Sequence, residues 1–223
     1  MKVTKANLLV CIVLMVLGPS MFLLMPMYIG AVSDSYGYSA SDLGLLASAD
    51  LIGFGIAGLL APLWINKVNW RICTILMWFT IIFGNYLSLS VHDYHGLFIL
   101  RLVIGLASGV VMSVATSCIS FANNPGRSFA IGVFLQVSYQ TISFMVLPDI
   151  IGEYQVEGFF YYLIALQLLI TPLLYFIPAY EKHNSHVETT SFGPRVSPVN
   201  CYKVLAAMGL FFVCQTGVFA FVD

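Results

Sequence analysis

Seven apolar runs of about 20 residues, separated by polar stretches, determine what this 223-residue chain can fold into. A helix needs about 20 apolar residues to cross the roughly 30 Å hydrocarbon core of a bilayer. The runs lie at residues 8–29, 43–65, 72–91, 96–121, 129–150, 158–178 and 202–222. Only 9% of the residues are charged, against about 25% in soluble domains. We therefore expect an all-α, polytopic membrane protein in contact with a lipid bilayer.

The charges of the polar stretches alternate in sign along the chain. Four stretches carry basic residues, which are Lys2, Lys5, Lys67, Arg71, Arg127, Lys182, Arg195 and Lys203. The three stretches between them contain no Lys or Arg and carry the acids Asp34, Asp42, Asp93, Glu153 and Glu157. Because cytoplasmic loops are rich in Lys and Arg, this pattern predicts a cytoplasmic N-terminus. Short outer stretches without an Asn-x-Ser/Thr motif favour a bacterial inner membrane as the location.

One long polar stretch divides the chain. Residues 179–200 are rich in Ser, Thr, Pro and charge, a composition typical of a flexible linker. We therefore expect a six-helix transmembrane bundle at residues 1–178, a cytoplasmic linker at 179–200 and a seventh transmembrane helix at 201–223. This order favours the first half of a twelve-helix protein and the beginning of its second half. The missing C-terminal six-helix half is then an expected partner.

Two ionisable residues lie well inside apolar runs. Arg101 follows the start of the fourth run by about five residues, and Asp50 follows the start of the second by about seven, so their depths are similar. An arginine inside a bilayer costs roughly 3 kcal/mol or more, which makes it a candidate functional residue. An Asp–Arg pair would reduce that cost. A structural ion pair and a site for a substrate anion or a proton both remain open.

Other polar or helix-breaking residues also lie inside the runs. Gly18 and Pro19 interrupt the first run, and proline removes a helical hydrogen bond, so we expect a tolerated kink or a break that lines a cavity. Gln136 and Gln140 in the fifth run lie four residues apart, with Tyr139 near the same face. Amides in hydrocarbon need partners, so these two either bond to other helices or line a wet cavity, and we favour the cavity.

Small residues recur at four-residue spacing in two runs. The fourth run has Gly105, Gly109, Ser113 and Ser117 in register with Arg101, and the second has Ala49, Gly53, Ala57 and Ala61. This spacing places each set on one helix face, where small side chains allow a neighbouring helix to approach closely.

The topology and the fourth run resemble the first half of a major facilitator superfamily transporter. That family often has an Arg-x-x-x-Gly-x-x-x-Gly pattern in its fourth span, and this chain has Arg101, Gly105 and Gly109 there. The resemblance implies a role for Arg101 in proton or substrate coupling. The turn between the second and third runs departs from the family's Gly-x-x-x-Asp-x-x-Gly-Arg pattern, because Pro62 stands where the acid is expected after Gly58.

These features predict a secondary active transporter that moves a small organic solute by alternating access. The lone buried cation favours a solute with an anionic group, and symport or antiport of an ion or proton is expected. We expect no enzyme activity, cofactor, metal site or nucleic-acid partner. Two alternatives stay open: efflux of apolar compounds or drugs, and a non-transporting seven-span protein of receptor-like or scaffolding type.

Overall fold

The computed structural model describes residues 4–178, and all regular structure in this part of the chain is helical. The expected linker at 179–200 and the seventh run at 202–222 lie outside the described residues. The elements in order are α1 (Lys5–Leu17), α2 (Ser20–Leu23), α3 (Met25–Tyr36), α4 (Ala40–Trp64), α5 (Trp70–Leu87), α6 (Tyr94–Ser120), α7 (Pro125–Ile170) and the 3-10 helix η1 (Thr171–Phe176).

The described helices have the length and apolarity that a membrane protein requires. Four of them, α4, α5, α6 and α7 with its continuation η1, are long and apolar enough to cross a bilayer. Their apolar side chains point outward as well as inward, because lipid solvates the outer faces. The prediction of helical structure is confirmed for residues 4–178, and four of the helices there have the length and apolarity that spanning a membrane requires.

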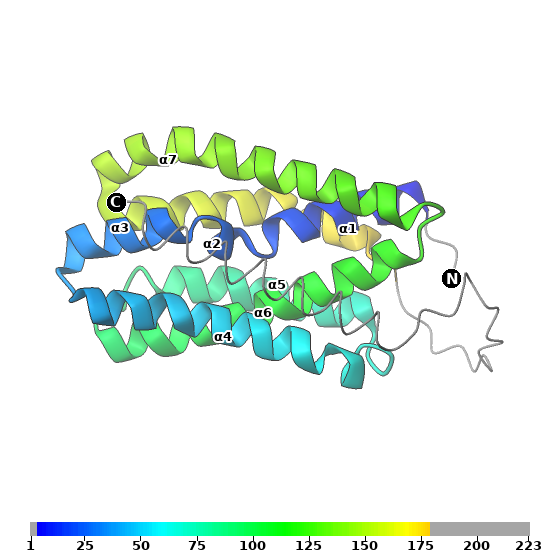
Figure 1. Cartoon of the computed structure of the whole chain (residues 1–223), viewed down its shortest axis with the longest axis horizontal. Coiled ribbons are helices and arrows are strands. Elements are labelled where there is room, and N and C mark those ends of the chain that lie inside the picture. The colour runs from blue at the N-terminus through cyan, green and yellow to red at the C-terminus, as the bar shows by residue number, and fades with distance from the viewer. Residues whose placement is uncertain (1–3, 179–223) are drawn as a thin grey trace, which may run out of the picture. The chain divides into compact units, whose positions relative to one another are not determined.

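The first apolar run is broken into three helices, α1, α2 and α3 (Figure 1). α1 ends at Leu17, immediately before Gly18 and Pro19. The second break lies at Leu24, and Pro26 occupies the first turn of α3. Proline lacks an N–H and is tolerated in a first helical turn, where that N–H would be unpaired. The two prolines therefore fix where the helix stops and restarts.

The fifth and sixth runs join within α7, where the sequence predicts a linker at 151–157. Gln155 alone leaves helical geometry, with φ 56° and ψ −145°, and the chain turns back there (Figure 1). We call residues 125–154 the first arm of α7 and residues 156–170 the second arm. A single residue replaces the expected linker, because the stretch contains no proline and its Glu, Gln and Tyr side chains are compatible with helix.

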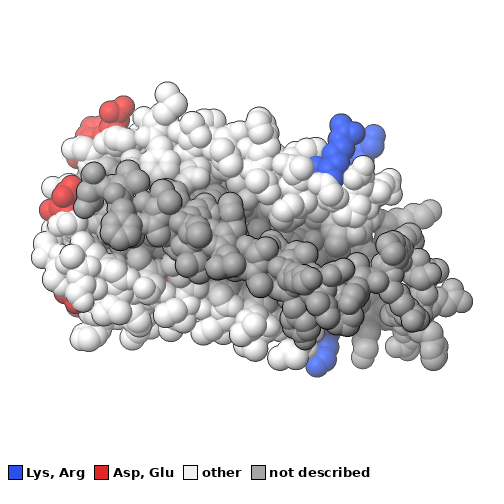
Figure 2. Space-filling view, in the orientation of Figure 1, with Lys and Arg blue, Asp and Glu red and all other residues white. Residues whose placement is uncertain are grey.

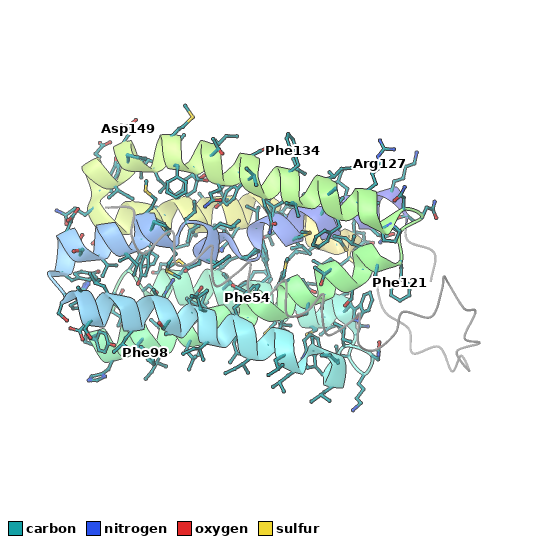
Figure 3. The ribbon with its side chains drawn as sticks, viewed as in Figure 1. Phe54, Phe98, Phe121, Arg127, Phe134 and Asp149 are labelled. Carbon is teal, nitrogen blue, oxygen red and sulfur yellow. The ribbon has the colours of Figure 1, made fainter. Side chains whose placement is uncertain are left out.

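The alternation of charge along the sequence becomes a separation in space. Figure 2 shows basic side chains toward one end of the described helices and acidic side chains toward the other. Arg127 at the start of the first arm of α7 and Asp149 near its end illustrate the two ends in Figure 3. We refer to these as the basic end and the acidic end.

Polar contacts tie the connections together at each end. At the acidic end the Tyr36 hydroxyl lies 3.1 Å from Nδ1 of His92, and the Tyr38 hydroxyl donates to the His92 carbonyl at 2.6 Å. At the basic end Nδ2 of Asn7 donates to the Phe176 carbonyl at 2.7 Å. These bonds hold the α3–α4 turn against the α5–α6 turn, and the start of α1 against the end of η1.

Candidate functional site

Arg101 is fully buried, and its two terminal nitrogens contact uncharged side chains, whereas its Nε has no hydrogen-bond partner among residues 4–178. Its side chain is 0% exposed. Nη2 donates to Oγ of Ser88 at 2.5 Å and to Oδ1 of Asn85 at 3.3 Å, and Nη1 lies 3.3 Å from Sδ of Met21. A thioether is a weak acceptor, so the strong hydrogen bonds come from the end of α5.

Two aromatic rings complete this enclosure. The guanidinium carbon of Arg101 lies 5.4 Å from the ring centre of Tyr28 and 5.3 Å from that of Phe160. Cation–π contacts at such distances stabilise a desolvated cation. Tyr28 comes from α3 and Phe160 from the second arm of α7, so segments distant in sequence meet at one charge.

Asp50 is buried nearby without forming the ion pair that the sequence suggested. Its side chain is 2% exposed, and Oδ1 has no hydrogen-bond partner among residues 4–178. Within the same residues no Arg101 nitrogen forms a salt bridge with it, although the two charges are close enough to interact electrostatically. The described residues therefore hold two separately buried charges, and the direct ion pair, one of the two alternatives left open, is not formed between them.

The packing of α4 on α6 explains the offset between the two charges. A Cβ added to Gly105 would collide with the backbone carbonyl of Asp50, so Asp50 lies level with Gly105. Gly109 faces Phe54 in the same way, so the two helices run in parallel. Arg101 is one turn, about 6 Å, before Gly105, and helical side chains lean toward the N-terminus. Its guanidinium therefore extends beyond the level of Asp50.

The small residues hold α4 and α6 at very short separation. Besides Gly105, a Cβ on Gly109 would come within 2.6 Å of the Phe54 carbonyl, and one on Gly53 would meet the Leu102 carbonyl. Ala57 is buried in this interface and faces Gly109. The close packing that the four-residue spacing predicts is thus realised between these two helices.

Two glutamines of α7 bind carbonyl groups of the broken first run. Nε2 of Gln136 donates to the Met15 carbonyl at 2.8 Å, and Nε2 of Gln140 donates to the Leu23 carbonyl at 2.8 Å. Both carbonyls belong to helix ends, which lack helical donors. Both amides thus form bonds to another helix, which is one of the two alternatives, and the cavity stays a prediction.

Gly18 and Tyr139 lie in the same region. A Cβ on Gly18 would approach Cγ1 of Val111 at 3.2 Å, so α1 passes close to α6 there. The hydroxyl of Tyr139 is buried beside Ser20 and Ser143. The polar side chains of α7 therefore surround the break that Pro19 introduces.

Sequence reasoning missed the residues that hold Arg101. Nδ2 of Asn85 donates to Oε1 of Gln167 at 3.3 Å, so a buried polar chain continues from Arg101 through Asn85 to the second arm of α7. Each of these two amides is the single Asn or Gln of its apolar run. Because an amide in hydrocarbon requires a partner, that isolation was a usable signal.

No cluster of three or more His, Cys, Asp or Glu side chains suited to a metal occurs among residues 4–178. The site therefore offers hydrogen bonds and two buried charges for its chemistry. Comparison of the chain with protein-family models, with curated proteins and with solved structures gives no match.

Proposed function

We propose that this chain is the first half of a secondary active transporter of the major facilitator type, located in an inner membrane with its N-terminus in the cytoplasm. The observation that carries the proposal is the burial of Arg101 and Asp50 among apolar helices, with one carboxyl oxygen of Asp50 unpartnered within the described chain. Ionisable residues inside membrane helices usually mark pathways for ions, protons or substrates.

The helix contacts support six crossings arranged as two related groups of three. The proposed crossings are α1–α3, α4, α5, α6 and the two arms of α7. The first crossing packs on the fifth through Met15 and Gly132, and the fourth packs on the second through Gly109 and Phe54. If crossing one is exchanged with crossing four, and crossing two with crossing five, each of these contacts becomes the other. This equivalence is the relation expected between inverted repeats in transporters.

The broken first crossing is a second support. Discontinuous helices in transporters provide backbone groups near the substrate site. Here the break lies beside Gln136, Gln140 and the buried hydroxyl of Tyr139. In a transporter, these amides would hydrogen-bond the free carbonyl groups at the break in one conformational state and release them in another.

We propose different roles for the two buried charges. The protein itself satisfies both terminal nitrogens of Arg101, so this residue fixes the surrounding helices. Asp50 retains an oxygen that can bind a proton or a solute group. We therefore propose Asp50 as the coupling residue of a proton-coupled transporter, with Arg101 as a positioning residue. The solute is proposed only as a small organic molecule.

A non-transporting membrane protein is the second candidate, and the enclosure of Arg101 favours it. A guanidinium whose two terminal nitrogens already have protein partners depends less on a solute for its stability. In that case the polar chain through Asn85 and Gln167 serves only to hold helices together.

Transport assays separate these candidates. The full-length gene product should be screened for uptake and efflux of small organic solutes in vesicles, with Asp50→Asn as the variant and the exposed Asp149→Asn as its control. Saturable flux whose pH dependence changes only in Asp50→Asn supports the proposal. Saturable efflux of apolar compounds identifies the drug-efflux alternative. Absence of any saturable flux would sink the proposal in favour of a non-transporting protein.

A further inference from the structure

Two cysteines from distant parts of the sequence meet in the apolar core near the basic end. Cys11 lies on α1 and Cys118 on α6, and both side chains are 0% exposed. Both are free thiols, and they interact directly through a side-chain hydrogen bond. The candidate site described above includes neither residue. A pair of thiols in contact differs from an isolated buried cysteine, because oxidation can join the two sulfurs.

The packing of α1 against α6 places the two cysteines at the same level. A Cβ added to Gly18 would lie 3.7 Å from Cβ of Val111, so the two helices are close there. Cys11 precedes Gly18 by seven residues, and Cys118 follows Val111 by seven residues. Because α1 and α6 run in opposite directions (Figure 1), these two steps lead to the same level. A disulfide requires Cβ atoms about 3.5–4.5 Å apart, and the separation at Gly18 and Val111 lies within this range.

A small oxidant has a short path to this pair. Cys118 lies two residues before Ser120, where α6 ends at the basic end. Burial in an apolar core hinders the reaction of a thiol with bulky or charged reagents, but hydrogen peroxide is small and uncharged. With the basic end in the cytoplasm, as proposed above, a reducing compartment keeps the thiols reduced until a peroxide is present.

We propose that Cys11 and Cys118 are a peroxide-responsive pair whose disulfide joins α1 covalently to α6. One sulfur attacks hydrogen peroxide: an S–O bond forms, the O–O bond breaks and one water leaves, which gives a sulfenic acid. The other sulfur then attacks the first: the S–S bond forms, the S–O bond breaks and a second water leaves. In total the two thiols lose two electrons and two protons, which the peroxide takes up as it becomes two molecules of water.

The disulfide would fix the position of α1. This helix ends at Leu17, and the break at Gly18 and Pro19 separates it from α2. Its position therefore depends on side-chain contacts with α6 and α7 and not on a continuous helix. A covalent bond to α6 would hold α1 in place, and because the loop that it closes is long, the unfolded chain would lose much of its conformational freedom. The proposal does not depend on transport.

Limited oxidation of the purified full chain in detergent micelles tests the proposal. The protein is treated with hydrogen peroxide, the remaining thiols are blocked under denaturing conditions, and the digested chain is analysed by mass spectrometry. We expect a peptide with Cys11 linked to a peptide with Cys118, and dithiothreitol should reverse the linkage. The oxidised chain should melt about 5–10 °C higher than the reduced chain. Oxidation after unfolding in dodecyl sulfate should not favour this pair.

Matched variants keep the test specific. Cys73, the third cysteine of residues 4–178, is half-buried on α5, so Cys73→Ser should keep both the linkage and the shift in melting temperature. Cys118→Ser should lose both. Absence of the linkage, a preference for another cysteine as partner, a linkage between two chains, or an unchanged melting temperature on oxidation would each overturn the proposal. The comparison of the oxidised and reduced forms of the unchanged protein needs no substitution, so it holds even if a variant fails to fold.

Discussion

Nε2 of Gln136 donates at 2.8 Å to the carbonyl of Met15, which is the carbonyl that Pro19 leaves without a helical donor. In an unbroken α-helix that oxygen accepts from the N–H four residues later, and residue 19 here has none. An amide from the fifth apolar run therefore repairs a defect in the first. Gln136 and Pro19 are therefore coupled through the Met15 carbonyl, without a hydrogen bond between them.

This coupling gives the first prediction. Gln136→Leu should lower the free energy of unfolding by roughly 1 kcal/mol, the usual range for a hydrogen bond between membrane helices. In a Pro19→Ala background the lost N–H returns, so the same change should have little effect. Chemical unfolding in detergent micelles provides the four values. Ser138→Ala, which loses a bond to Phe134 in its own helix, is the control, and an equal loss in both backgrounds would contradict the coupling.

Separate burial of the two charges gives the second prediction. Arg101→Gln should lower the free energy of unfolding by about 3–5 kcal/mol, because it empties a buried polar network. Asp50→Asn should leave it unchanged or raise it by about 1 kcal/mol, because a neutral amide replaces a buried acid without a salt bridge. The measurement is thermal unfolding in detergent. Equal destabilisation by both changes would instead reveal a direct ion pair.

Close packing of α4 on α6 gives the third prediction. Gly105→Ala places a methyl group against the Asp50 carbonyl, and overpacking of this kind costs roughly 1–3 kcal/mol. Gly58 has nothing within 4 Å of an added Cβ in the described chain, so Gly58→Ala should raise stability by up to about 1 kcal/mol through helix propensity. The two melting temperatures should move in opposite directions. If both melting temperatures moved in the same direction, α4 and α6 would not be packed as closely as the structure shows.

The turn in α7 gives the fourth prediction. Gln155 has φ 56° and ψ −145°, a conformation that side chains other than glycine rarely adopt. Gln155→Gly should raise the free energy of unfolding by about 1 kcal/mol, while Gln155→Ala should give no gain, because alanine keeps the Cβ. Unfolding curves of the two variants measure the difference between their free energies of unfolding. Equal values would show that Gln155 is not strained.

Charge separation gives the fifth prediction, which concerns orientation. Reporter fusions near Tyr94, at the acidic end, should show external activity, and fusions near Arg127, at the basic end, should show cytoplasmic activity. A fusion at Pro194 should also be cytoplasmic. Reversed activities would overturn the proposed orientation.

The sequence predicted the helices because apolar run length and proline positions determine them locally. The runs at 43–65 and 96–121 correspond to α4 and α6, and Gly18 and Pro19 mark the break between α1 and α2. It predicted the reversal between the fifth and sixth runs as a linker at 151–157, but not that Gln155 alone would make the turn. Local chemistry therefore predicted the elements better than their connections.

The sequence could mark Asn85 as a polar group in need of a partner, but it could not show that this partner is Arg101. In a soluble helix an apolar stripe reveals which face is buried. Here lipid and protein core are equally apolar, so the sequence does not indicate how α3, α5 and α7 rotate about their axes. Depth along the helix was predictable, and Asp50 and Arg101 are both buried. The rotation that directs Arg101 toward Asn85 and Ser88 became visible only in the structure.

The enclosure of Arg101 has a consequence for biosynthesis. A ribosome releases α6 well before the second arm of α7, so the guanidinium enters the bilayer before Phe160 exists to cover it. Until then Asn85, Ser88 and the Tyr28 ring must shield the charge. Completion of the bundle is thus tied to the arrival of one late aromatic side chain. A nascent chain that stops before Phe160 would lack one of the two rings that cover Arg101.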